Sequence, residues 1–427
     1  MNLVTIAFMP ISHDEAYYTL YANNLDWGFY DHPPLVGLFI KFGQIFGDHA
    51  FFLRLFFFLC QTGLILLISK FNKNLFWLSL STLFVHSGFL AIPDSLLLVF
   101  TFAYFFLLQK FIFTKGKGNL KYSLLLALTI GLGLLGKYHL FLAVIFTFVA
   151  YPKLLLRKET LLVTILSFII FLPHFKWMID HDYITWKFHL FGRQNAVRGV
   201  DNFTSLIGSY IALGGLVLSI PLFYFVIKIK PKDQFDKILK LCFLGQAGFF
   251  LLLSFRNSIE GNWLLTMVVP GLIIISRPDH LKINVEKWKN YFLINFLILF
   301  ILRIMFLMPI RSYPIPRLAE LFQWENLSVQ IQDICEDQPI YANSYQVAAK
   351  LTYYLKKEIP ALHLFGRKSH YTLLEENKKF SHPQEEFCFV SNFKIPNAIK
   401  IRTVFEGKLY IDPKYKSPKA RPIRSGW

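Results

Sequence analysis

Two short polar segments near the amino terminus carry side chains that can move protons and bind phosphate. Residues 14–18 read Asp-Glu-Ala-Tyr-Tyr, and residues 30–34 read Tyr-Asp-His-Pro-Pro. A carboxylate can take the proton of an attacking hydroxyl group, and a neighbouring cation can stabilise a phosphate. Both segments precede a long apolar stretch, so we expect them at a membrane surface. A lipid-borne phosphate and a water-soluble group can both arrive there, which indicates an enzyme acting at the membrane face.

The composition indicates which elements must position these segments. The chain has 427 residues, of which 54% are hydrophobic and 18% aromatic, and its mean hydropathy is +0.43. Successive apolar runs of nearly twenty residues match the thickness of a bilayer core. The net charge of +18 lies largely in short gaps between these runs, as topology signals do, which argues against nucleic-acid binding. The sequence therefore predicts a mainly α, polytopic helical membrane protein.

Ten apolar runs are candidates for membrane-spanning helices. They cover residues 50–70, 75–92, 93–113, 119–137, 138–157, 159–175, 204–229, 238–255, 262–277 and 289–308. Alternate gaps between them are rich in lysine and arginine, and the positive-inside rule places those gaps in the cytoplasm. The gaps that then face outward are 12–49, the turns at 93–94 and at 137, 176–203, 256–261 and everything after 308. All the unusual polar residues lie on this outward side.

The two ends of the chain depart from the pattern of spans. Residues 1–11 are apolar but too short to cross a bilayer, so either the chain starts on the outer side or it is a truncated or misassigned version of a longer one, and we favour the second. After residue 308 the composition shifts, and residues 309–411 indicate a small α/β domain on the outer side. Residues 412–427 are basic and rich in proline, and we expect them to be poorly ordered. The remaining domain, residues 1–308, would carry the catalytic outer loop 12–49.

The small domain is predicted to contain one amphipathic helix at residues 346–356, with its apolar side chains on one face. Strand-like runs cover residues 339–342, 361–364 and 387–391, and a hairpin is expected around residues 406–407. Two of the four cysteines, Cys335 and Cys388, fall in this domain and could form a disulfide.

Each acidic segment also has a purely structural explanation. Asp14 and Glu15 open an amphipathic segment that runs to Trp27, so they could simply be the acids of a helix's first turn. Residues 31–34 could be a turn followed by a helix, because proline suits the first helical position. The closeness of the two segments in the sequence favours a function for the second one.

Three charged residues lie close to the ends of predicted spans. Asp94 follows a proline at the boundary between two runs and could merely cap the next helix. Lys137 ends the small-residue run 131–136 and could snorkel towards the interface. Arg54 lies about one turn inside a span, where an unpaired cation is unfavourable by roughly 2.5–3.5 kcal/mol at mid-depth and by less near the interface. Arg54 therefore needs an anionic partner, for which a phosphate is one candidate.

Further polar residues surround the outward loop 176–203, and they include His174, His181, Asp182, His189, Arg193 and Arg198. These side chains could bind a phosphate or a metal, but their spacing is not diagnostic of a metal site, and ordinary interfacial roles explain most of them. Arg256 and Glu260, in the next outward gap, could form a surface ion pair.

Taken in order, these residues resemble the bacterial branch of the protein O-mannosyltransferase and lipid A aminoarabinose transferase superfamily. The matching motifs are Asp14–Tyr18, Asp31–Pro34, Leu53–Leu55, Pro93–Asp94, Gly136–Tyr138, Leu172–His174 with Trp177, Asn262–Trp263 and Ala342–Val347. The resemblance covers about residues 12 to 395. It implies a GT-C type membrane fold with an active site at the outer face and a sugar donor attached to polyprenyl phosphate. The chain departs from the superfamily at its amino terminus, where members have a whole helix before the acidic pair.

The resemblance also assigns roles to the acidic segment. Asp14 would be the general base that takes the proton of an acceptor hydroxyl. Glu15 would be the alternative base or would orient the loop, and Tyr17 would support them. If the acceptor were an ionised phosphate instead, Asp14 would chiefly position the substrates.

Cations and supporting groups complete the expected site. The leaving phosphate would be stabilised by four cations, first Arg54 and Lys137 and then His32 and Arg256. Asp31 could orient His32, or it could bind a divalent metal together with His174, although no cofactor is required. Asp94 would organise Lys137 or the acceptor side of the cavity.

The resemblance thus implies an inverting glycosyltransferase of the bacterial inner membrane, with its active site and small domain on the periplasmic side. It would move a hexose or pentose unit from polyprenyl phosphate to lipid A, to another envelope glycan or to a protein. A lipid or sugar transporter is one alternative, but transporters usually bind near the bilayer midplane and often contain repeats. An inactive binding or scaffold protein is the other alternative.

Overall fold

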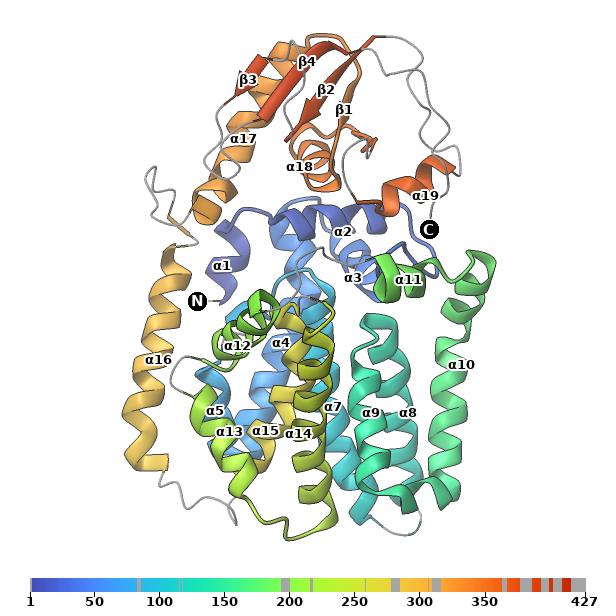
Figure 1. Cartoon of the computed structure of the whole chain (residues 1–427), viewed down its shortest axis with the longest axis vertical. Helices are drawn as coiled ribbons and strands as arrows, with labels where there is room; N and C mark the ends of the chain where they lie inside the picture. The colour runs from blue at the N-terminus through green and yellow to red at the C-terminus, as the bar shows by residue number, and fades with distance from the viewer. Residues whose placement is uncertain are drawn as a thin grey trace. The chain divides into compact units, whose positions relative to one another are not determined.

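The computed structural model divides the chain into two compact units. The described residues are 2–82, 86–114, 116, 118–192, 200–215, 218–257, 259–277, 285–305, 307–308, 316–362, 367–376, 386–392, 399–401 and 409–415. Met1–Phe8 and Leu25–Ile304 form the first unit, called the helical unit below. Met9–Asn24 and Met305–Trp427 form the second, called the mixed unit. Figure 1 labels the elements of both, and the segment that carries Asp14 belongs to the mixed unit.

The helical unit contains the helices that can cross a membrane. Among the described residues, five helices are long and apolar enough, or six if the bent pair α12 (Val200–Gly214) and α13 (Ser219–Lys228) is one span. The five are α4 (Ala50–Phe71), α7 (Pro93–Phe113), α8 (Gly118–Gly136), α10 (Lys158–Asp180) and α14 (Gln234–Ser254). The predicted polytopic helical membrane fold is therefore confirmed.

Several of the ten apolar runs are shorter or broken in the structure, so they do not pass as single spans. The run 75–92 overlaps the eight-residue helix α5 (Lys73–Leu80), and the run 138–157 contains the eleven-residue helix α9 (Leu140–Ala150). Eleven helical residues extend about 17 Å, which is roughly half of a bilayer core. Pro152 begins a 3-10 helix directly after α9, because proline cannot continue an α-helix. Hydropathy alone does not reveal such breaks.

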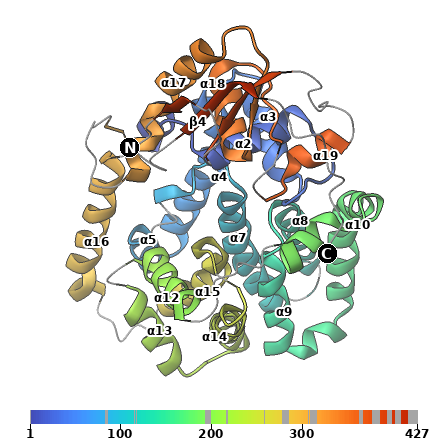
Figure 2. The same cartoon turned by 45° about the horizontal axis from the view of Figure 1, so that its top comes forward.

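The centre of the helical unit is α15 (Leu265–Ser276), all of whose side chains are buried. It packs against α14, α7 and α13, which Figure 2 shows in a view tilted by 45° from that of Figure 1. Next to this group, α8 lies between α7 and α10. Small residues allow the close approach of α8, because a Cβ atom at Gly131 would lie 2.7 Å from Cβ of Ile170. The run of small residues before Lys137 therefore serves helix packing, as the sequence indicated.

Two buried arginines hold the first helix, α1 (Asn2–Phe8), in the helical unit. Arg54 of α4 donates from Nη1 to the carbonyl oxygen of Ile6 at 3.4 Å. Arg303 of α16 (Val285–Met305) donates from Nε to Oγ1 of Thr5 at 2.9 Å and from Nη1 to Asn2. The short apolar start of the chain is thus a helix that packs against α4 and bonds to α16.

The mixed unit contains a four-stranded sheet with strand order β1-β2-β4-β3. Its strands are β1 (Ile340–Ala342), β2 (Phe387–Ser391), β3 (Ile399–Ile401) and β4 (Leu409–Tyr415). Strand β1 runs parallel to β2, and the other neighbours are antiparallel. Its helices are α2 (His13–Asn23), α17 (Pro316–Cys335), α18 (Tyr345–Leu355) and α19 (His370–Glu376). The helix predicted at 346–356 is α18.

The strand predictions hold in part. The runs at 339–342 and 387–391 are strands β1 and β2. The hairpin was expected around residues 406–407, and the antiparallel strands β3 and β4 lie on either side of that position, whose own residues are outside the description. The run at 361–364 forms only an isolated bridge from Ala361 to Ala342, and residues 363–366 are outside the description. The tail boundary at 411 was wrong, because β4 continues to Tyr415 and Asp412 pairs with Phe389.

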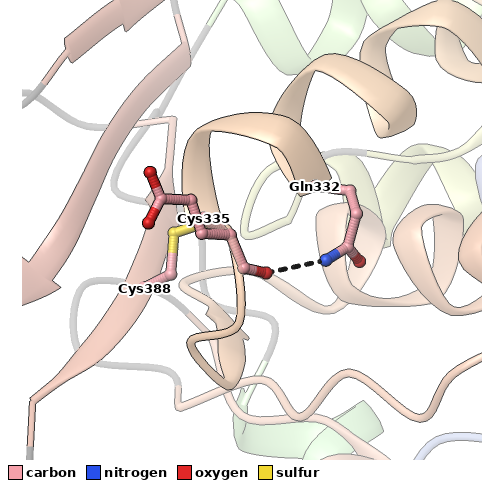
Figure 3. Close-up of a disulfide and its surroundings, with 4 residues drawn as sticks. Gln332, Cys335 and Cys388 are labelled. Atoms are coloured by element: carbon pink, nitrogen blue, oxygen red, sulfur yellow. Dashed lines mark hydrogen bonds between the residues drawn. A yellow bond between two sulfur atoms is a disulfide. The ribbon is translucent and has the colours of Figure 1, made fainter.

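A disulfide joins Cys335, the last residue of α17, to Cys388 of β2, with their Cα atoms 5.5 Å apart (Figure 3). Both cysteines are buried. Gln332, one turn earlier, donates from Nε2 to the carbonyl oxygen of Glu336 at 3.0 Å and so helps to end the helix. The bond between the two cysteines, which the sequence left open, is thus present and fixes α17 to the sheet.

Candidate active site

The two acids of the first polar segment differ in burial and in bonding. A capping box starts α2: Glu15 N donates to Ser12 Oγ at 3.2 Å, and Ser12 N donates to Glu15 Oε2 at 3.0 Å. Glu15 is 1% exposed, whereas Asp14 beside it is exposed. Glu15 is therefore engaged in the cap of α2, whereas Asp14 lies on the exposed side of the same turn.

Tyr17 fixes the other side of α2 to the rest of the mixed unit. Its hydroxyl oxygen accepts a hydrogen bond from His370 N at 2.8 Å. Its ring lies 4.7 Å from that of Tyr345 and 6.4 Å from that of Tyr371, between ring centroids. Burial raises the pKa of Tyr371 above its usual range, so this hydroxyl stays protonated. Because Tyr17 is itself 1% exposed, its supporting role is to position α2.

The helical unit has a charged cluster of its own. Lys137, which follows α8, forms an ion pair through Nζ with Oδ1 of Asp94 at the start of α7. Asn262 Nδ2 donates to the other oxygen, Oδ2, at 3.0 Å. The side chains of Lys137 and Asp94 are only 4% and 13% exposed. The expectation that Asp94 contacts Lys137 agrees with this geometry, and the two contacts compensate the buried carboxylate.

A pocket of about 240 Å³ adjoins this cluster. Its walls come from the segment before α7, from α7 itself, from α12 and from the 3-10 helix Gly261–Leu264 with the start of α15. Asp94 and Asn262 line it together with serines and leucines. The arrangement offers a small concave site with a few polar groups, as small-molecule sites do.

Three side chains of α10 and of the segment after it hold the loop that carries the second polar segment. Trp177 Nε1 donates to Oδ2 of Asp26 at 2.9 Å, and Thr185 Oγ1 donates to the carbonyl oxygen of Phe29 at 2.8 Å. His189 Nε2 lies 2.9 Å from the carbonyl oxygen of Asp31. Since a carbonyl only accepts, this nitrogen must carry the proton. Asp31 itself is buried, so this loop is held by hydrogen bonds at Asp26, Phe29 and Asp31.

The geometry of His174 does not support the metal site that the sequence allowed. Its Nδ1 lies 2.6 Å from the carbonyl oxygen of Trp27 and must donate, so Nε2 is an acceptor. Nε2 in turn lies 2.6 Å from the hydroxyl of Tyr138, which donates to it. A metal ligand needs a lone pair, and the one on this ring is already used. In the described part of the chain, moreover, no group of three or more His, Cys, Asp or Glu residues could hold a metal ion.

The four expected phosphate-binding cations differ in accessibility. Arg54 is fully buried and Lys137 is 3% exposed. His32 is half-buried, with its ring centroid 6.0 Å from that of His189, and Arg256 is exposed. Arg193 and Arg198 lie outside the described residues. The two cations of the predicted spans are therefore enclosed, whereas His32 and Arg256 keep part of their surface exposed.

Sequence reasoning missed three residues that the structure brings into the site. Asp26 and Thr185 hold the loop between α2 and α3 (Leu35–Gln44), and Ser95 lines the pocket beside Asp94. Ser95 could have been found, because it directly follows Asp94 at a helix start where both side chains lie at one end. Nothing in the sequence pairs Asp26 with Trp177, since they are 151 positions apart.

The fold and the buried charged cluster define a polytopic membrane protein of the GT-C type. The family of dolichyl-phosphate-mannose-protein mannosyltransferases matches residues 31–177, about a third of the chain. The fold is similar to that of ArnT from Cupriavidus metallidurans in the apo state, with a TM-score of 0.66 and 12% identity. That similarity covers 96% of this chain and 95% of that one. These matches bear out the resemblance to the mannosyltransferase and aminoarabinose transferase superfamily, in fold over nearly the whole chain and in sequence over residues 31–177.

A second solved structure, ArnT from the same organism bound to undecaprenyl phosphate, is also similar. Its TM-score is 0.64, with the same identity and the same coverage of both chains. No curated protein matches this chain in sequence.

Proposed function

We propose that the chain is a glycosyltransferase that moves a sugar from a polyprenyl phosphate to an acceptor of the cell envelope. The observation that carries this proposal is the fold shared with ArnT over 96% of the chain, because one structure of that protein holds undecaprenyl phosphate. The match to a dolichyl-phosphate-mannose-dependent family supports the same class of donor. In this proposal the acceptor attacks opposite the leaving phosphate, so the anomeric centre is inverted.

Asp14 is the general base of the proposed reaction. An acceptor hydroxyl is a poor nucleophile at neutral pH, so a carboxylate must take its proton while the glycosidic bond forms. The burial difference supports Asp14 over Glu15, because Asp14 is exposed and Glu15 is engaged in the capping box. The proton moves to the Asp14 carboxylate and the bonding electrons of the donor leave with the lipid phosphate.

Cations stabilise the negative charge that accumulates on the leaving phosphate. The accessible candidates, His32 and Arg256, are the ones we expect to contact it directly. Lys137 shares its charge with Asp94, and the buried Arg54 bonds to α1, so we expect both to act mainly by holding the structure around the site. Asp31 and Asp94 are supporting residues in this proposal.

We place the protein in a bacterial inner membrane, with the mixed unit on the periplasmic side. The five or six candidate spans support a multi-pass protein, and alternate basic gaps support the orientation. The disulfide between Cys335 and Cys388 supports the same side, because such bonds persist in oxidising compartments and are rare in the cytosol. Lipid A, another envelope glycan or a protein would be the acceptor.

The experiment that tests the proposal measures release of undecaprenyl phosphate from a labelled undecaprenyl-phosphate sugar by the purified full-length chain. The enzyme should release the lipid phosphate when membrane extract supplies an acceptor, and Asp14→Asn should not. A transporter or a scaffold protein would bind or move the donor without cleaving it. Mass spectrometry of envelope lipids and glycans, from cells with and without the gene, would then identify the transferred sugar and its acceptor.

A further inference from the structure

Lys350, in the middle of α18, is fully buried and has no part in the reaction proposed above. Full burial of an ammonium group is unfavourable unless other groups replace its hydration, so a lysine is almost never found there without partners. Its Nζ donates to the carbonyl oxygen of Ile11 and faces the rings of Trp324 and Tyr354, whose centroids lie 5.9 and 5.8 Å away. The ammonium group therefore lies where α17, α18 and the start of α2 meet within the mixed unit.

The bond to Ile11 holds one side of a peptide group whose other side is held by Glu15. Lys350 donates to the carbonyl oxygen of this peptide, and Ser12 N, which belongs to the same peptide, donates to Oε2 of Glu15 at 3.0 Å. In a trans peptide the C=O and N–H groups lie in one plane and point in opposite directions. A cation at the oxygen and a carboxylate at the N–H polarise the peptide in the same sense, so each bond strengthens the other. The peptide that leads into α2 is thus fixed from both sides.

The residues on both sides of Asp14 are also held. The ring of His13 packs edge-on against that of Trp324, with their centroids 5.5 Å apart, and Glu15 is bound in the capping box. Ile11 and Glu15 are each 1% exposed, whereas Asp14 is exposed. A fixed backbone limits the carboxylate of Asp14 to the few positions that its side-chain rotamers allow. The contacts around this turn therefore determine where the carboxylate can point.

The place of Lys350 is not one that helix stability alone would select. The amino end of a helix carries a partial positive charge, so a cation is unfavourable there and acids are favourable. The two acids of the first turn, Asp14 and Glu15, offset the cation. A buried ionic arrangement is often no more stable than apolar residues of similar volume. The position of this ammonium group is therefore better explained by what it holds than by stability.

The motif Ala342–Val347 accounts for the placement of Lys350. Asn343 N donates to a carbonyl oxygen of β2 at 2.8 Å, and Ser344 Oγ caps α18 by accepting from Val347 N at 3.4 Å. Lys350 follows within the next two turns, on a helix that packs against α2. The sheet, α18 and the peptide before α2 thus form one connected support.

We infer that Lys350 is a positioning residue of the transfer reaction, which holds the peptide between Ile11 and Ser12 so that Asp14 meets the acceptor hydroxyl group. The inference rests on the proposed function, in which Asp14 is the general base, and adds a residue that acts through this base. Because Lys350 is fully buried, it acts on Asp14 and not on the substrates. A displacement of about 1 Å at a reacting group can lower a rate about 10²-fold, so the loss of Lys350 should appear in kcat.

The test removes the ammonium group with Lys350→Met, whose side chain is of similar length and can still pack on Trp324 and Tyr354. Full-length protein in detergent releases undecaprenyl phosphate from a labelled undecaprenyl-phosphate sugar, with membrane extract as the source of acceptor. For Lys350→Met, kcat should fall about 10- to 100-fold, while KM for the donor should change less than about twofold. A kcat within about threefold of the wild-type value overturns the inference while the proposed function stands. No release by the wild type overturns both.

The matched control is Ser328→Ala. Ser328 is a buried residue of α17 in the same unit, and its hydroxyl donates to Glu325 O at 2.7 Å. This variant also loses a buried polar group but leaves the start of α2 untouched, so its kcat should stay within about twofold of the wild-type value. An equal loss of kcat in Ser328→Ala and Lys350→Met would show a general effect on folding and overturn the inference.

A double-mutant cycle with Asp14 separates positioning from a purely structural role. In the Asp14→Asn background, Lys350→Met should lower the residual kcat by less than about twofold, since no base is left to position. A loss of folded protein would instead lower kcat by the same factor in both backgrounds, and that result overturns the inference. If Lys350→Met does not fold, Lys350→Gln takes its place in the cycle with the same expected results, because it removes the charge and keeps a polar group.

Discussion

Lys137 and Asp94 form a buried ion pair although they are 43 positions apart and belong to the ends of different helices. The pair joins the carboxyl end of α8 to the amino end of α7, and Asn262 adds a third segment through Asp94. A buried charge is tolerated only with such partners. The pair therefore fixes where three helical elements meet at the proposed site.

Removing one member of this pair should destabilise the protein strongly. Lys137→Met leaves the Asp94 carboxylate buried with only Asn262 as partner, so we expect a loss of about 3–5 kcal/mol of unfolding free energy. The double variant Lys137→Met with Asp94→Asn should regain most of that loss, because no charge stays buried. Thermal and denaturant unfolding of detergent-purified protein would measure both. Equal stability of the single and double variants would contradict the assignment.

Variants at the start of α2 should affect stability and activity separately, because the cap residue Ser12 and the proposed base Asp14 are different side chains. Ser12→Ala should lower the free energy of unfolding by about 0.5–2 kcal/mol, since the helix loses its side-chain cap. Asp14→Asn should change stability little but reduce release of undecaprenyl phosphate by about 10²- to 10⁴-fold, the usual contribution of a general base. Normal turnover by Asp14→Asn would remove this residue as the base. Glu15→Gln is the neighbouring comparison and should resemble Ser12→Ala.

Sequence reasoning was most successful where a local pattern determines structure. The apolar runs predicted a helical membrane fold, and the amphipathic pattern of 346–356 predicted α18, because periodicity depends on near neighbours. Within the described residues, fewer helices than the ten predicted runs are long and apolar enough to span a bilayer alone, since a break such as the one after α9 is produced by a single turn within an apolar run. Hydropathy averages over about twenty residues and does not detect it.

The site was predictable in its residue types but only partly in its contacts. Asp94 was expected, from the resemblance, to organise either Lys137 or the acceptor side of the cavity, and the structure pairs it with Lys137. The capping box that engages Glu15 is a local Ser-x-x-Glu pattern at residues 12–15, but the difference in exposure between Asp14 and Glu15 also depends on the packing of α2 against α18, which no local pattern reports. The metal expectation failed at His174, because its two ring nitrogens are used by Trp27 and Tyr138.

The disulfide of the mixed unit predicts how its two cysteines respond to alkylation and how much they stabilise the unit. Protein isolated from membranes should show Cys335 and Cys388 protected from alkylation until a reductant is added. Replacing both by serine should lower the stability of the mixed unit by about 2–4 kcal/mol, as expected for a bond that closes a loop of 53 residues. Cys60 and Cys242 are free thiols and provide the control, because replacing them should leave the reductant-dependent alkylation unchanged. Full alkylation without reductant would contradict the bond.

Removal of divalent metal should leave the proposed transfer intact. His174 uses both ring nitrogens in hydrogen bonds, so a metal could bind it only by displacing Trp27 O or the Tyr138 hydroxyl. We therefore expect undecaprenyl phosphate release to continue at an unchanged rate in excess chelator, measured after dialysis against the same chelator. Tyr138→Phe serves as the companion variant. It frees Nε2 of His174, so any metal response that appears only in this variant would show that the hydroxyl normally blocks the site. A chelator-sensitive wild type would instead require a metal held by other residues.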